Sequence, residues 1–357
     1  MKKAFCAAAI ALSFFAAGCA IHPLPEDVTF VDTYHIVRQI RCEARETVRL
    51  EVIKWLNKMA KFGDPLAQQL ALQYESDPES ISSFHYDVFK GAEYAKIRSV
   101  AKLFYDTGIA YNFDLTMTEN NDLSGSVDFL KPFTQPKFTL GISAGAKRQR
   151  SNNRTFTVTD TFSYLLTKLN VDVRGFRYCD GQIVQANYAY PIAGRIGIDR
   201  LVKDFIELTL FGSLAEPKSV PGATGAPTMA DKLTFTTAIN ASANPVVVFT
   251  PVTHAFQLTN ASLTASADRK DTHQVTVALA IATGSMAELD PVRSFLFSRE
   301  RNAAIAGGSA VGGRGRTTSS VVVGRRITGG GNTPSEALAV IAIDQLKSRE
   351  FDLIPPP

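Results

Sequence analysis

The chain has 357 residues, of which 45% are hydrophobic, 20% charged and 10% aromatic, and its formal net charge is +4. These proportions describe an ordinary globular protein and exclude the collagen-like, intrinsically disordered and disulfide-packed miniprotein classes. The length is sufficient to bury a large core in one or two domains. Four cysteines in a chain of this length are too few for a disulfide framework.

The first residues have the pattern of a secretion signal. Met1 is followed by two lysines and an apolar run over 4–15, and Ala16-Ala17-Gly18 then leads to Cys19. The apolar run is too short to span a bilayer as a helix. A basic start, a short apolar run and a small-residue cleavage site together indicate a secretory signal peptide.

This segment resembles the signal of bacterial lipoprotein precursors, whose small-residue lipobox ends in a cysteine. The resemblance covers residues 1–19 and implies cleavage between Gly18 and Cys19, a diacylglyceryl group on the Cys19 thiol and an acylated new amino terminus. Two or more acyl chains give stable anchoring. Ala20, in place of the aspartate that often retains such proteins in the inner membrane, implies an outer-membrane anchor with a periplasmic body. The alternative is a plain secretory signal with a chance cysteine.

The remaining chain divides by composition and periodicity. A stretch rich in Pro, Gly and Ala at 216–230 reads as a loop or linker, and it leaves one domain or two open. The predicted regions are a signal peptide (1–18), a lipidated tether (19–32), a helical segment with the first β block and a middle helix (33–215), a second β block (231–300), a Gly/Arg-rich flexible segment (301–333) and a C-terminal helix and tail (334–357).

Apolar residues at three- and four-residue steps predict an amphipathic helix from Asp32 or Thr33 to about Lys61. Arg41, Arg45 and Arg49 share a basic stripe on it. Further helices are expected over 66–74, 93–105, 198–210 and 334–349, the third ending at Gly212 and the last starting with proline.

Between the helices the period of the apolar residues changes to two. The alternation predicts strands over 109–118 and 123–129 with a turn at 119–122, then over 138–144 and 156–162, and a second block over 232–239, 245–250, 254–267 and 273–283. Each of the four strands before residue 163 has one apolar face and one face of Thr, Ser, Asn or Asp, which is typical of antiparallel meanders. The predicted fold class is therefore α+β.

Two cysteines, Cys42 and Cys179, remain in the body of the secreted chain. The oxidising compartment allows a disulfide between them. The sequence leaves open whether they form this bridge or stay as two buried thiols.

One motif has the residues of an enzyme site. Gly141-Ile142-Ser143-Ala144-Gly145 matches the G-x-S-x-G nucleophile elbow, which needs a sharp turn from a strand into a helix. Here the strand alternation runs through the motif and a polar segment follows, so Ser143 is predicted to be a small outward residue, and a hydrolase is disfavoured. The five histidines have no metal-ligand spacing. The sequence therefore proposes no catalytic residue, metal or cofactor.

Two basic clusters are candidates for contact with an anionic surface, against the alternative of solvated loops without a partner. They are Lys147, Arg148, Arg150 and Arg154 in a predicted turn, and Arg314 and Arg316 in the glycine-rich tract. A protein in the envelope meets anionic lipid or polysaccharide first, so nucleic acid is not an expected partner.

The leading hypothesis is a non-enzymatic, lipid-anchored envelope protein that binds or scaffolds an envelope protein or polysaccharide. The runner-up is an export or pore-forming lipoprotein that pools strands with copies of itself, because 109–118 and 137–146 have the length and alternation of membrane-spanning strands. A soluble sheet packed on helices shows the same alternation. The helices at 33–61 and 93–105 need an apolar surface to cover, which favours the soluble interpretation.

Overall fold

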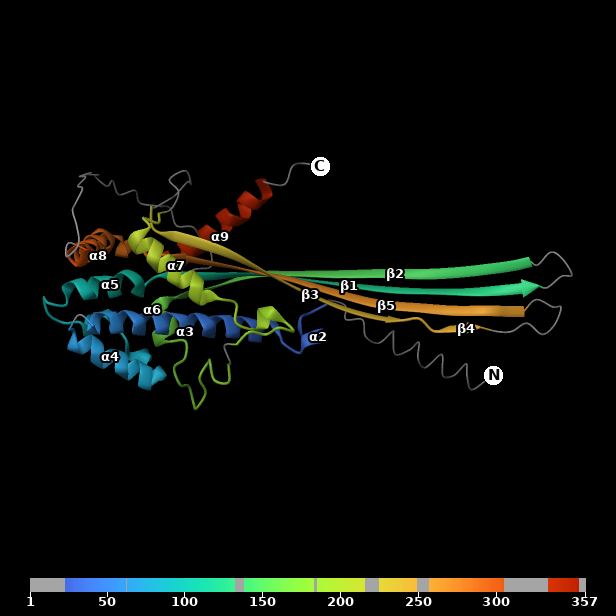
Figure 1. The fold of residues 1–357 in the computed structure, drawn as a ribbon, viewed down its shortest axis with the longest axis horizontal. Coiled ribbons are helices and arrows are strands. Elements are labelled where there is room, and N and C mark those ends of the chain that lie inside the picture. The colour runs from blue at the N-terminus through green and yellow to red at the C-terminus, as the bar shows by residue number, and fades with distance from the viewer. Residues whose placement is uncertain are drawn as a thin grey trace. The chain divides into compact units, whose positions relative to one another are not determined.

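The computed structural model describes residues 23–61, 63–131, 138–182, 185–215, 225–248, 257–304 and 333–352 (Figure 1). The predicted signal peptide, Cys19, Arg314 and Arg316 lie outside the described residues. The fold is α+β, as predicted. Among the described residues, no helix is both long and apolar enough to cross a bilayer.

Helices and strands follow one another along the described chain. The elements are α2 (Glu26–Thr29), α3 (Thr33–Ala60), α4 (Pro65–Ser76), η1 (Pro78–Ser83), η2 (Tyr86–Val88), α5 (Ala95–Tyr105), β1 (Gly108–Lys131), β2 (Phe138–Thr161), α6 (Phe162–Thr167), η3 (Pro191–Ala193), α7 (Ile198–Phe211), β3 (Thr228–Ala243), β4 (Val246–Val248), β5 (Gln257–Ala280), η4 (Thr283–Glu288), α8 (Leu289–Ala304) and α9 (Pro334–Asp352).

The chain forms two compact units, each built from segments that are separate in the sequence. Unit 1 comprises Met1–Thr33, Asp114–Arg154 and Thr234–His273, and unit 2 comprises Tyr34–Phe113, Thr155–Leu233 and Gln274–Pro357. The strands β1, β2, β3 and β5 each have residues in both units. The boundaries between the units fall within these strands. Of the linker expected over 216–230, residues 216–224 lie outside the described residues, and β3 begins at Thr228.

One antiparallel sheet contains all the described strands. Its order is β2-β1-β5-β3, and β4 pairs with β5 in the register that sets Val247 opposite Ala261 (Figure 1). β1 and β5 are thus the central strands, and β2 lies at one edge and β3 with β4 at the other.

The turns predicted at 119–122 and 147–154 do not form. β1 and β2 are each one continuous strand of 24 residues, and the described residues of the predicted strands 254–267 and 273–283, up to Ala280, likewise form the single strand β5 (Gln257–Ala280). The polar run at 119–122 stays extended because β1 is central, so neighbours on both sides pair its backbone groups. Glu119 also has a charged partner, Arg269 of β5, at 3.0 Å.

The five predicted helices are confirmed as α3, α4, α5, α7 and α9. The N–H of Gly212 donates to Leu208 O at 2.9 Å at the end of α7. Two helices differ from the prediction. Phe162 begins α6, capped by the Thr161 hydroxyl, rather than ending a strand, and α8 occupies part of the second β block.

The core of unit 2 forms where helices cover its strand segments. Side chains on both faces of β1 are fully buried there, including Ala110 on one face and Tyr111 and Phe113 on the other. Helix α9 approaches β1 closely, and a Cβ on Gly108 would lie 2.3 Å from the backbone carbon of Ser335. Only glycine at position 108 permits that approach.

The arginine stripe of α3 is buried in unit 2 rather than solvated. Arg41 pairs with Asp160 at 2.6 Å and Arg45 with Glu79 at 2.9 Å. On another face of α3, the carboxylate of Glu43 accepts from the N–H groups of 196–198 at 2.7–2.9 Å. These groups open α7, so Glu43 fixes the start of that helix.

Candidate functional site

The sheet in unit 1 has two faces of opposite character. The hydroxyls of Ser126 and Ser262 lie 2.6 Å apart, and those of Thr118 and Ser151 lie 3.4 Å apart, which fixes how β1 pairs with β5 and β2. Because successive side chains alternate across a strand, this register assigns every residue to a face.

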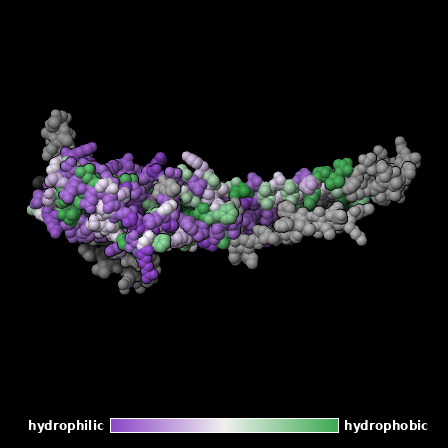
Figure 2. Space-filling view, turned by 90° about the horizontal axis from the view of Figure 1, so that it is seen from below, coloured by the Kyte–Doolittle hydropathy of each residue, from purple (hydrophilic) through white to green (hydrophobic). Residues whose placement is uncertain are grey.

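One face is apolar across the whole width of the sheet, and we call it the apolar band. Its members are Leu123, Val127, Phe129, Leu140, Ile142, Ala144, Ala146, Ala241, Ala243, Val247, Ala261, Leu263 and Ala265. The large side chains are exposed: Leu123 and Leu140 each to 43% and Ile142 to 51%. In Figure 2 hydrophobic residues gather toward the loop end of the strands. An exposed apolar surface of this extent marks an interaction site.

The opposite face, the polar face, consists of small polar residues. They are Ser124, Ser126, Asp128, Thr139, Ser143, Asn240, Ser242, Asn244, Asn260, Ser262, Thr264 and Ser266, with Val246 and Val248 as exceptions at the edge. Asp128 is the one charged residue within 123–129, 139–146, 239–248 and 260–267. Asn260 Nδ2 donates to its carboxylate at 3.3 Å.

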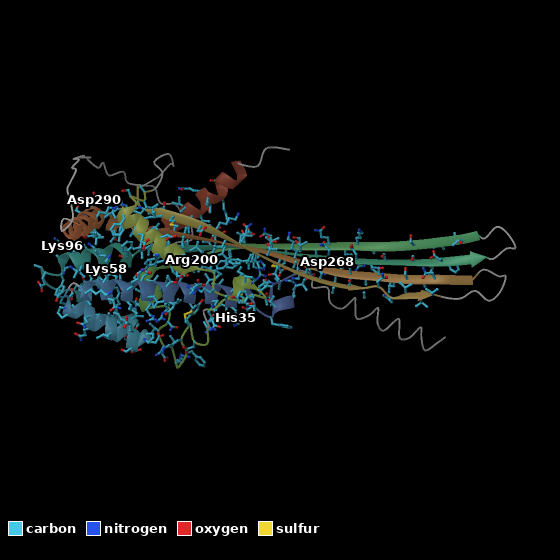
Figure 3. All side chains as sticks on the ribbon, in the orientation of Figure 1. His35, Lys58, Lys96, Arg200, Asp268 and Asp290 are labelled. Carbon is cyan, nitrogen blue, oxygen red and sulfur yellow. A yellow bond between two sulfur atoms is a disulfide. The ribbon has the colours of Figure 1, made fainter. Side chains whose placement is uncertain are left out.

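Charged residues follow directly along the strands, in what we call the charged belt. Its members are Glu119, Lys147, Arg148, Arg150, Arg154, Asp268, Arg269, Asp271 and His273; Figure 3 labels Asp268 on β5. Arg269 is the buried centre of this belt, since it pairs with Glu119 at 3.0 Å and with Asp271 at 2.8 Å. Alternation sets Arg148 and Arg150 on the same side of β2 as the apolar band.

The described part of the predicted tether lies against this belt. Asn152 Nδ2 donates to Pro23 O at 3.0 Å, and Arg269 Nη2 donates to Leu24 O at 2.5 Å. Arg154 Nη1 donates to the Thr33 hydroxyl at 2.7 Å. The belt therefore fixes the chain that follows the predicted lipidation site.

His273 is the buried titratable group of the belt. Burial lowers the pKa of its imidazole below 6.5, Asp271 raises it in part, and Arg269 lowers it further. Asp271 Oδ2 lies 3.8 Å from His273 Nε2. Burial therefore favours the neutral imidazole at neutral pH.

The structure brings Cys42 and Cys179 together within unit 2. They form a disulfide with a Cα–Cα distance of 5.7 Å (Figure 3). Arg38 Nη2, one turn earlier on α3, donates to Asp180 O at 2.7 Å. The bridge and this bond attach the segment around Cys179 to α3.

The other predicted candidates have no catalytic arrangement around them. Ser143 lies within β2 on the polar face, with no turn into a helix after it. In the described part of the chain, no three His, Cys, Asp or Glu side chains are grouped to hold a metal. A cavity of about 110 Å³ in unit 2 is apolar, and Glu51 and Tyr105 are the ionisable residues among those that line it.

The sequence interpretation missed the β3, β4 and β5 part of the apolar band. A signal for it is present: from Leu233 to Ala267 the chain has no Asp, Glu, Lys or Arg. A long uncharged stretch that alternates alanine, valine or leucine with Ser, Thr or Asn is typical of strands with two different environments.

Residues 22–292, which include all the described strands, match a family described as "Uncharacterised protein y4kA". The "Uncharacterized protein y4kA" of Sinorhizobium fredii (strain NBRC 101917 / NGR234) is 34% identical to this chain over 278 residues. That alignment covers 76% of this chain and 82% of the relative. The chain therefore belongs to the y4kA family.

Proposed function

We propose that this protein is a lipid-anchored envelope protein whose unit 1 sheet inserts into a membrane with copies of itself and lines a pore for export. The observation that carries the proposal is the pairing of an exposed apolar band with a regular polar face on the same five-stranded sheet. A single sheet with two such faces fits a boundary between hydrocarbon and water.

The dimensions of the band support insertion. Membrane-spanning strands use about 9–11 tilted residues each to cross a bilayer. The uncharged parts of β2 (138–146), β3 (233–243) and β5 (257–267) have about this length, and β1 contributes the shorter segment 123–129, whose one charge is Asp128 on the polar face. Their apolar side faces lipid in the proposed arrangement, and the small Ser, Thr and Asn side chains line the aqueous path.

The charged belt supports a membrane boundary at one end of the band. Arg148 and Arg150 follow the apolar residues on the lipid-facing side, where guanidinium groups bind lipid phosphates. Pro23 is bound to the belt, and four residues reach at most about 14 Å, so a lipid on Cys19 enters the leaflet beside it. Ala20 fits the inner leaflet of the outer membrane and a periplasmic body.

The binding or scaffolding role that leads on sequence grounds is less well supported by the geometry. A partner protein would need to cover the apolar band, but such a cover does not explain why the opposite face is uniformly small and polar. Pore formation accounts for both faces at once.

The experiment uses the mature acylated protein in vesicles loaded with a fluorescent dye. Arg at the lipid-facing midplane costs about 2–4 kcal/mol per copy, whereas an interior-facing Arg is tolerated. Ile142→Arg should therefore reduce the fraction of protein inserted in the vesicles by more than about tenfold, while its neighbour Ser143→Arg should leave the inserted fraction within about twofold. No release by the vesicle-bound wild-type protein, or equal losses in both variants, would contradict the proposal.

The anchor is tested separately by metabolic labelling with a fatty acid. Cys19→Ser should abolish the label and release the precursor from lipid attachment, because the thiol that receives the diacylglyceryl group is gone. A labelled Cys19→Ser protein would show that acylation occurs elsewhere.

A further inference from the structure

We infer that neighbouring copies join edge to edge, the outer edge of β2 in one copy pairing with the outer edge of β3 and β4 in the next. The inference rests on the proposed function and names its partner, a second copy of this chain. Each copy uses both of its edges, so the contact is head to tail and repeats.

The two edges lack the features that normally prevent strand pairing. Proteins protect edge strands with lysine, proline, bulges or short length. Residues 139–146 of β2 and 239–248 of β3 and β4 contain no charge, and β2 is 24 residues long. These are the outer strands of the sheet, so each has a neighbour on one side.

Pro245 does not interrupt the outer edge. Its carbonyl accepts the N–H of Leu263 at 3.1 Å, so this residue directs its backbone groups toward β5. The backbone N–H that a proline lacks would therefore point toward β5 and not toward the outer edge. Residues 239–244 contain no proline, so they can pair along the outer edge.

A membrane makes open edges costly. Each unpaired backbone N–H or C=O in hydrocarbon costs several kcal/mol, and only closed sets of strands avoid this cost. The apolar band therefore cannot enter a bilayer with β2 and β3 unpaired. A second copy supplies the missing partner for each edge without any other protein.

Strand direction selects the pairing. Neighbours in the order β2-β1-β5-β3 are antiparallel, so β2 and β3 at the two edges run in opposite directions. A β3 next to the β2 of another copy thus continues the antiparallel alternation. Two β2 edges joined by a two-fold axis would instead form a closed dimer and leave both β3 edges open.

The faces also restrict the register. The apolar band is continuous across the junction only when polar-face residues of β2 lie beside polar-face residues of β3. Ser143 must therefore neighbour Asn240, Ser242, Asn244, Val246 or Val248, and a shift by one residue would reverse the faces.

Oxidative crosslinking of cysteine pairs in the vesicle-bound protein tests this pairing. Ser143→Cys is combined in one chain with a polar-face cysteine, Asn240→Cys, Ser242→Cys, Asn244→Cys, Val246→Cys or Val248→Cys, and in matched controls with Ala241→Cys or Ala243→Cys. Within one copy β1 and β5 separate these positions by three strand spacings, about 14 Å, beyond the roughly 7 Å reach of a disulfide. Every crosslink therefore joins two copies.

We expect a ladder of dimers, trimers and larger multiples from at least one polar-face pair, with at least about five times the yield of either control. Dimers from Ser143→Cys alone, without a ladder, would overturn the inference by showing β2–β2 pairing. Absence of any crosslink in a protein that still releases dye would overturn it too, while leaving the pore proposal intact. A ladder without dye release would support the edge pairing and count against the pore.

Discussion

The same strands meet opposite conditions in the two units. In unit 2 both faces of β1 are covered, so Ala110 and its neighbour Tyr111 are each 0% exposed. In unit 1 the exposure begins farther along β1, where Leu123 on one face is 43% exposed and Ser124 on the other is also exposed. Strand geometry is shared; what differs is which side chains alternate along it.

The difference shows in the residues themselves. The buried part of β1 is apolar at nearly every position, as expected for a strand with helices or loops over both faces. From Leu123 to Phe129 apolar residues alternate with serine and aspartate. A core explains the first pattern, whereas the second requires two unlike surroundings, which membrane insertion provides.

The largest expected effect concerns the disulfide of unit 2. Cys42 and Cys179 are separated by 137 residues, and a loop of this length predicts a loss of about 5 kcal/mol when the bridge is removed. Cys179→Ser should shift urea unfolding followed by Trp55, the single tryptophan, which lies in unit 2. Unchanged unfolding of this variant would mean that the bridge does not stabilise unit 2.

Two leucines, one buried in unit 2 and one exposed in unit 1, allow the stability contributions of the two units to be compared. Leu103 of unit 2 is 0% exposed and Leu263 of unit 1 is 37% exposed. Leu103→Ala should cost about 3 kcal/mol, because it leaves a cavity, and Leu263→Ala in detergent should cost less than about 1 kcal/mol. Equal costs in urea unfolding would contradict the assignment of the core to unit 2.

The carboxylate of Glu43 gives a smaller effect. Glu43→Ala leaves three N–H groups at the start of α7, two of them buried, without their acceptor and should cost about 2 kcal/mol. The control is Glu51→Ala on the same helix, whose partner Lys54 is exposed, with an expected cost below about 1 kcal/mol. Similar thermal stability of the two variants would show that the hydrogen bonds of Glu43 do not stabilise unit 2.

The smallest effect lies in unit 1 and depends on pH. Because the pKa of His273 is lowered below 6.5, the unfolded chain takes up the proton at higher pH than the folded chain. The contribution of the neutral His273 to folding stability is therefore complete above pH 6.5, and it is lost as the pH falls toward the lower pKa of the folded protein. His273→Gln should reduce this acid sensitivity by less than about 1 kcal/mol, measured by circular dichroism. If the pH dependence of stability is the same in His273→Gln as in the wild-type protein, His273 does not cause the loss of stability in acid.

The local elements could be predicted, but their connections could not. Amphipathic periodicity and caps located α3, α7 and α9, since helices form from contacts within one segment. The run at 119–122 looked like a turn because its partner Arg269 is 150 residues away, and a single strand does not reveal its neighbours. The apolar band and the polar face each consist of residues from distant segments of the chain, and only the strand register shows which of these residues share a face.

In the proposed arrangement the apolar band faces lipid. The accessibility of positions along β2 to water tests this orientation. Single cysteine substitutions from Thr139 to Ala146 in the vesicle-bound protein are treated with a water-soluble maleimide. If the apolar band faces lipid, the reaction rate should alternate along β2. Odd-numbered positions should react, and even-numbered positions from Leu140 to Ala146 should react at least about ten times more slowly. Equal reaction rates at odd and even positions would contradict it.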